Sequence, residues 1–208
     1  METSIISRED GLIIKAMAIF LIVFQHVGQA FKISAVNPLG PIGVFLFLFM
    51  SGYGLTCSFI EKGREHYIWN KIKKVYLPYA FSVVVFALIQ RLFFQNKISV
   101  FGLCQYLSLY SLPQGSHWYM QLILLWYIAF WFLSFFLKKT SGIFGTVIAS
   151  ILVLIGMRWN ISAVWQVFSF PLGIAVALNQ NKALEFKTKL KSIRGGGIAF
   201  NRYSVGCI

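Results

Sequence analysis

Long apolar runs, nearly free of charged residues and separated by short basic stretches, constrain this chain more than any other feature. A helix needs about 20 mainly apolar residues to cross a bilayer. Such segments lie at residues 12–31, 40–60, 76–94, 118–137, 143–157 and 161–178. We therefore expect an all-α fold, a polytopic transmembrane helix bundle of about six spans. Because only Arg158-Trp159-Asn160 separates the last two segments, a re-entrant pair is the alternative there.

The composition favours the same class of protein. Hydrophobic residues make up 58% of the 208 residues and charged residues 12%, whereas soluble domains have about 45–50% and about 25%. The net charge of +13 would indicate nucleic acid in a soluble protein. Here the basic residues lie between apolar runs, where membrane proteins place their topology signals. We expect the lipid bilayer, and no nucleic acid, as a partner.

The basic residues also predict an orientation. If the N-terminus is cytoplasmic, 15 of the 19 Lys and Arg residues fall on the inner side. The outer side then holds only Lys32, Arg91, Lys97 and Arg158. We expect both termini in the cytoplasm.

The chain divides at about residue 180. Residues 1–180 are predicted to form the membrane domain, and residues 181–208 a basic cytoplasmic tail. Glu9 and Asp10 do not fit the basic start of a signal peptide, so we interpret residues 12–31 as a retained helix. The three cysteines have no metal-ligand spacing, and we expect no metal.

Polar residues inside the first apolar run are candidates for function, because ionisable groups are costly in a membrane. His26 follows Lys15 by eleven positions, which is close to three helical turns, so both point to one side about 16 Å apart. Gln29 shares a face with His26. The alternatives are that Lys15 is a snorkelling topology charge and that His26 makes a helix–helix hydrogen bond.

The second apolar run pairs glycines with bulky residues and contains Ser51. Small residues allow helices to approach closely in lipid, and Ser51 can bond back to its own helix, so packing alone explains the pattern.

Two further polar regions lie between spans. The inner loop before Pro78 carries Lys71 and Lys74, which suit either anionic lipid headgroups or the phosphates of a cytoplasmic donor. His117 precedes the fourth run at the outer side, where it either joins His26 at an outer cavity or is solvated.

Taken together, these motifs resemble the acyltransferase 3 family of multi-spanning membrane O-acyltransferases. Lys15 and His26 hold the places of a basic residue and a His in the family's first helix. Gly43-Val44-Phe45 through Ser51-Gly52 resembles the block in its second helix. Lys71 and Lys74 match a basic pair before a proline, and His117-Trp118-Tyr119-Met120 resembles the opening of a later helix. The resemblance covers about residues 8–180, with Lys where the family favours Arg.

The resemblance implies transfer of an acyl group, most often acetyl, from cytoplasmic acyl-CoA to a hydroxyl of a cell-envelope saccharide at the bacterial plasma membrane. It implies that His26 is a general base or transient acyl carrier, that Lys15 stabilises charge on the donor, and that Lys71 and Lys74 hold its phosphates. His117, Gln29 and Ser51 are accessory candidates. Because family members are usually longer, we expect an N-terminal or truncated member. The alternatives are a transporter or flippase with His26 in its pathway, and an inactive remnant.

Overall fold

The computed structural model describes residues 5–95, 98–108, 118–135, 142–157 and 161–180. Of these residues 85% are helical and none lies in a β-strand, which confirms the all-α expectation for the part described. Two compact units are distinguished. Unit 1 contains residues 1–63 and 165–208, and unit 2 is Arg64–Val164.

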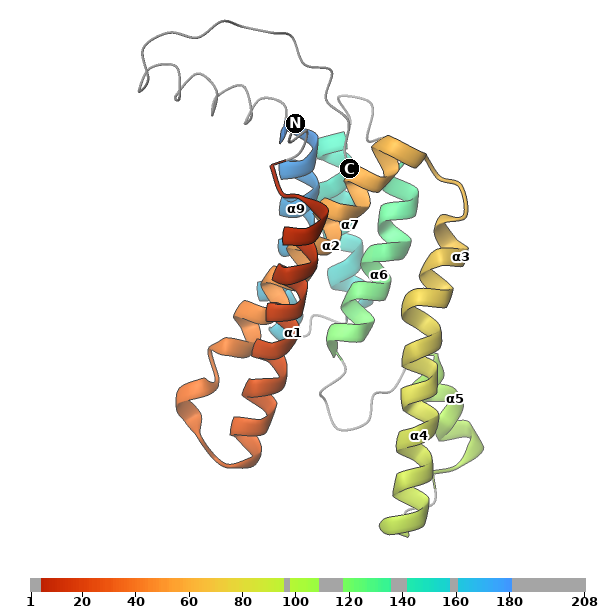
Figure 1. Cartoon of the computed structure of the whole chain (residues 1–208). Helices are drawn as coiled ribbons and strands as arrows, with labels where there is room; N and C mark the ends of the chain where they lie inside the picture. Colours follow the sequence, from red (N-terminus) through yellow and green to blue (C-terminus); the bar gives the residue numbers. More distant parts are fainter. Residues whose placement is uncertain (1–4, 96–97, 109–117, 136–141, 158–160, 181–208) are drawn as a thin grey trace, which may run out of the picture. The chain divides into compact units, whose positions relative to one another are not determined.

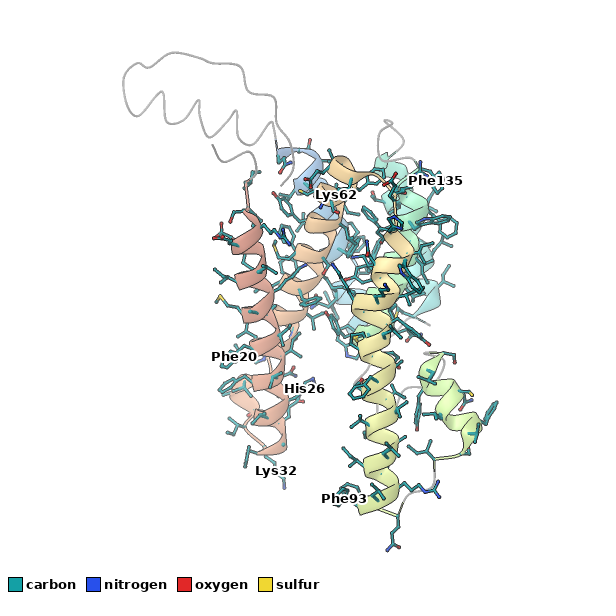
Figure 2. The ribbon with its side chains drawn as sticks, turned by 45° about the vertical axis from the view of Figure 1, so that its right-hand side comes forward. Phe20, His26, Lys32, Lys62, Phe93 and Phe135 are labelled. Atoms are coloured by element: carbon teal, nitrogen blue, oxygen red, sulfur yellow. The ribbon has the colours of Figure 1, made fainter. Side chains whose placement is uncertain are left out.

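Unit 1 begins with a helical hairpin. Helix α1 (Arg8–Ala30) leads through a single 3-10 turn, η1 (Ser34–Val36), into α2 (Leu39–Lys62), which runs back alongside α1 (Figure 1). The start of α1 is capped by Ser7, whose side chain accepts a hydrogen bond of 3.1 Å from the backbone N–H of Asp10. Lys32 and Lys62 lie at opposite ends of this hairpin (Figure 2).

Helix α2 is the central element of unit 1, with α1 on one side and α9 (Ser169–Leu178) on the other. Glycines make both contacts possible. A Cβ added to Gly43 would lie 2.5 Å from the carbonyl oxygen of Ala18 in α1. A Cβ on Gly52 would overlap the carbonyl oxygen of Phe170 in α9. Close approach through small residues is how helices associate in lipid, where apolar side chains gain little by leaving the solvent.

The other side of α1 is apolar and exposed. Only 11% of its most apolar stretch is buried, against 61% for α2. Leu12, Phe20 and Val23 are each more than half exposed. A continuous apolar surface of this length on a single helix is suited to the hydrocarbon interior of a bilayer.

In unit 2 the chain forms one continuous helix from Tyr67 to Phe93, made of α3 (Tyr67–Lys71), a π-helical turn η2 (Ile72–Tyr76) and α4 (Leu77–Phe93). The other helices of the unit include α5 (Val100–Leu107), α6 (Trp118–Leu133) and α7 (Gly142–Gly156). Tyrosine hydroxyls join α5 and α6 to the long helix. Tyr79 donates to the carbonyl of Tyr106 at 2.7 Å, and Tyr67 donates to the carbonyl of Tyr127 at 2.9 Å.

The π-helical turn has a local cause. Pro78 has no N–H and therefore cannot donate to the carbonyl of Lys74, four residues back. One residue earlier, the N–H of Leu77 bonds to the carbonyl of Ile72, five residues back. The turn therefore widens where the proline removes a donor, which shifts the side chains before it relative to those of α4.

The predicted spans correspond to helices with adjusted ends. Within the described residues, three helical stretches are long and apolar enough to cross a membrane: Arg8–Ala30, Ser34–Lys62 and Tyr67–Phe93. The remaining three predicted spans correspond to shorter apolar helices, α6, α7 and the stretch ending in α9.

Two expectations need correction. The inner loop expected around residues 71–79 is helical, because the aromatic residues of α3 pack against α6 and extend the helix beyond the purely apolar run. The span expected at 161–178 is interrupted at Val167 and Phe168, between α8 (Ile161–Gln166) and α9. Pro171 explains the interruption, because it has no N–H to donate to the carbonyl of Val167, four residues back, and fits best in the first turn of a new helix. The predicted tail, residues 181–208, lies outside the described residues.

Candidate functional site

The polar flank of α1 carries the two residues that the sequence singled out. His26 is exposed, and Lys15 is half-buried with its Nζ 5.9 Å from the centre of the Phe47 ring of α2. Eleven positions separate them, so they lie about 20° apart around the helix and about 16 Å apart along it. Figure 2 shows His26 leaving α1 on a different side from Phe20, which is on the apolar face.

Amide side chains surround the level of His26. Gln29 is exposed and its Nε2 donates to the Asn37 Oδ1 at 3.4 Å, which joins α1 to the chain just after η1. The side chain of Gln25 lies directly against Gly40, where a Cβ would overlap it. Two amide side chains therefore make contacts where α1 connects to α2, about one helical turn from the imidazole.

Ser51 lies deeper, in the middle of α2. Its side chain is buried, and its Oγ has no hydrogen-bond partner among the described residues. Ser51 follows Phe47 by four positions and so shares its face of α2. The Phe47 ring, one turn before Ser51, is the ring over which the Lys15 ammonium lies.

The basic pair belongs to unit 2, and its two members differ. Lys71 is half-buried, with its Nζ 4.6 Å from the centre of the Tyr127 ring and 5.7 Å from that of Tyr67. Lys74 is exposed. Three positions apart on a regular helix they would share a face, but the π-helical turn between them separates their directions.

A groove of about 230 Å³ lies beside Lys71, between the start of the long helix and α6. Its lining consists of Tyr67, Ile68, Lys71, Ile72, Tyr76, Leu124, Tyr127, Ile128 and Trp131. The surface of the groove is almost wholly apolar, with Lys71 contributing its aliphatic stem, so the groove suits an apolar group. Cation–π contacts to two tyrosines hold the ammonium at this position.

The other predicted site residue, His117, lies outside the described residues. Among the residues that the structure describes, no three His, Cys, Asp or Glu side chains gather as metal ligands would.

Sequence reasoning missed a buried polar pair in unit 1. Gln166 donates through Nε2 to the carbonyl of Pro41 at 3.2 Å, and Ser169 donates to the Gln166 Oε1 at 3.1 Å. Both side chains are buried. They lie near the start of α2, where Gln25 contacts Gly40. The sequence could have indicated Gln166, because this polar residue interrupts an apolar run as Gln25 does.

Comparison with known proteins identifies the family. A model of the acyltransferase 3 family, described as an acyltransferase domain, matches residues 13–200. The chain belongs to the acyltransferase 3 family. This membership, together with the exposed apolar helices, identifies it as a membrane protein of an acyltransferase family. No curated protein and no solved structure gives a significant match.

Proposed function

We propose that this protein is a membrane-bound O-acyltransferase. It moves an acyl group, acetyl in the simplest case, from cytoplasmic acyl-CoA to a hydroxyl of a cell-envelope saccharide. Membership of the acyltransferase 3 family supports the class of reaction. The observation that carries the rest is the single flank of α1 on which Lys15 and His26 lie about three turns apart.

The proposed topology has about six crossings of the bacterial plasma membrane, with both termini in the cytoplasm. The hairpin of unit 1 supports this orientation. Arg8 and Lys62 lie at one end of it and Lys32 alone at the other, which agrees with the excess of basic residues on the inner side. His26 then lies toward the outer leaflet and Lys15 toward the cytoplasm.

In the proposed reaction, His26 acts as general base. Its imidazole takes the proton of the acceptor hydroxyl while the hydroxyl oxygen attacks the thioester carbonyl carbon. The new ester C–O bond forms, the C–S bond breaks, and the coenzyme leaves as a thiol after taking the proton from the imidazolium. The alternative step, in which His26 first carries the acyl group on its own nitrogen, uses the same residue.

Basic residues position the donor. Lys71 and Lys74 attract the phosphate groups of acyl-CoA near the inner surface, and Lys15 stabilises negative charge on the donor. His117, Gln29 and the amides near it contact the saccharide. Because the donor is cytoplasmic and His26 lies toward the outside, the arm that carries the acyl group has to extend into the membrane domain.

The test is incorporation of a radiolabelled acetyl group into cell-surface glycan by cells that express the wild type or His26→Ala. We expect the variant to lose at least about 100-fold in rate, the usual effect of removing a general base. His66→Asn is the matched control, because His66 is exposed in unit 2 and Asn tolerates its positive φ of 52°.

Wild-type incorporation that survives in His26→Ala would remove His26 from the mechanism. Absence of incorporation, and of acyl-CoA consumption by purified wild type, would contradict the proposed enzyme and favour an inactive remnant. Solute uptake that requires His26 and no acyl donor would favour a transporter.

A further inference from the structure

The groove of unit 2 presents apolar surface that no other described part of the unit covers. The long helix contributes Ile68 and Ile72 to its walls, and α6 contributes Leu124 and Ile128. Ile68 and Ile128 are each more than half exposed, so the groove opens at the surface of the unit. Exposed apolar surface of this kind is stabilised when hydrocarbon covers it.

The length of the groove matches one leaflet of a bilayer. Its lining residues on the long helix extend from Tyr67 to Tyr76, nine positions that span about 14 Å along the axis. Half of the hydrocarbon core of a bilayer is about 15 Å thick. The hydrocarbon chain of a lipid that lies along the groove therefore has a suitable length.

Positive charge gathers at one end of the groove, at the start of α3. The Lys71 Nζ lies 5.7 Å from the centre of the Tyr67 ring, one turn earlier in the helix. The Lys73 Nζ lies 4.9 Å from the centre of the Trp69 ring, again one turn earlier. Helical side chains lean toward the N-terminus of their helix, which brings both ammonium groups toward the exposed Arg64.

Arg64 connects this charge to the groove. Its guanidinium lies 3.8 Å from the centre of the Phe135 ring. Phe135 in turn meets Trp131 edge to face, with the ring centres 5.3 Å apart, and Trp131 lines the groove. Stacking uses the flat face of the guanidinium and leaves the N–H donors at its edge, where they can bind a phosphate. One ring separates the cation from the groove, and the glycerol of a phospholipid spans such a separation between its phosphate and its chains.

We infer that the groove binds one hydrocarbon chain of an anionic phospholipid, whose phosphate is held by Arg64. Four basic residues and one carboxylate, that of Glu65, fall between positions 64 and 74. This surplus of positive charge favours a lipid with a net negative charge over a zwitterionic lipid. The lipid site goes beyond the proposed acyl transfer, since it needs neither Lys15 nor His26.

The experiment measures the Kd of the purified full-length protein in detergent for two short-chain lipids by titration calorimetry. We expect dioctanoyl-phosphatidylglycerol to bind at least about five-fold more tightly than dioctanoyl-phosphatidylcholine, the effect of about one basic residue near a membrane surface. Arg64→Gln should lower this preference about five-fold. Arg91→Gln is the matched control, because Arg91 is also exposed and lies in the last turn of α4, at the other end of the long helix.

A second variant tests the position of the chain. Ile128→Trp fills the groove, so it should raise the Kd for phosphatidylglycerol about ten-fold, as would the loss of contact with about two methylene groups. Ile148→Trp is the matched control, because Ile148 lies in α7 and has the same exposed fraction, 58%. Glycerophosphoglycerol, the headgroup without chains, should bind far more weakly than the lipid. If it binds as tightly, the site is one for a free phosphate and the inference is wrong.

Two other results would also overturn the inference. One is an equal Kd of the wild type for both lipids. The other is that Ile128→Trp weakens binding of a thioether analogue of acetyl-CoA and leaves lipid binding unchanged, which would assign the groove to the donor. Neither measurement requires acyl transfer, so loss of acetyl incorporation contradicts the proposed function alone.

Discussion

Gly52 of α2 and Gly173 of α9 fit against each other's helix backbone. A Cβ on Gly52 would overlap the carbonyl oxygen of Phe170, and a Cβ on Gly173 would overlap that of Phe49. Both obstacles are backbone atoms, which no change of rotamer can move. The contact joins the start of the chain to a segment more than a hundred positions later.

Substitution at this crossing should destabilise unit 1. We expect Gly173→Ala to lower stability by about 1–3 kcal/mol, because the two helices have to separate to admit the methyl group. The measurement is thermal unfolding in detergent, followed by loss of monodisperse protein. Gly54→Ala is the matched control, since a Cβ at Gly54 meets nothing within 4 Å. Equal midpoints for both variants would show that the crossing tolerates a side chain.

The hydroxyl of Tyr53, the residue after Gly52, should stabilise the same unit. It accepts from the N–H of Ile6 at 3.4 Å and donates to the Gln180 Oε1 at 3.0 Å, within a buried region. Tyr53→Phe should cost about 1–2 kcal/mol. A double-mutant cycle with Gln180→Leu measures the pair directly. Additive effects of the two substitutions would exclude a coupled hydrogen bond in the membrane-embedded protein.

Lys71 and Lys74 should respond differently to salt. If both attract the phosphates of acyl-CoA, Lys71→Met and Lys74→Met each raise the donor Kd at low ionic strength. At 0.5 M NaCl the effect of Lys74→Met should vanish, because an exposed charge is screened, whereas that of the half-buried Lys71 should persist. The Kd of each variant at low and high salt is the measurement. Identical salt dependence would show that the groove does not distinguish the two lysines.

Pro78 should control where Lys71 points. Pro78→Ala restores an N–H that can bond to the carbonyl of Lys74, so we expect the π-helical turn to relax to an α-helix. Lys71 then leaves its position over Tyr127, and Lys71→Met in this background should add little to the loss of donor affinity. Comparing Lys71→Met with and without Pro78→Ala tests this. A full additional effect would mean that the turn does not position the lysine.

Much of the fold was predictable because lipid imposes a simple requirement. A helix that crosses a bilayer has to be long and apolar, so hydropathy located α1, α2 and α4 within a few residues. The predicted helix ends were wrong where something other than the need to cross the bilayer decides where a helix begins. Tyr67–Lys71 is helical because its aromatic residues pack on α6. The apolar stretch at 161–178 divides into α8 and α9 because of Pro171.

The candidate site was predictable in part. Helical periodicity alone placed Lys15 and His26 on one flank of α1. Periodicity within one helix could not show that Lys15 lies over the Phe47 ring, because this depends on the register of α1 against α2, set by the glycines of both helices. Nor could it reveal the partnership of Gln166 with Pro41, which joins positions 125 apart.

Unit 1 is built from two segments of the chain that are far apart in sequence, and this affects its assembly during synthesis. The hairpin of α1 and α2 leaves the ribosome before the whole of Arg64–Val164, and α9 follows only after it. At about 5–20 residues per second, translating roughly a hundred residues keeps the hairpin waiting for about 5–20 s. During that interval the glycine-lined side of α2 faces lipid or some temporary neighbour. A nascent chain stalled in this window would be the form most exposed to membrane quality control.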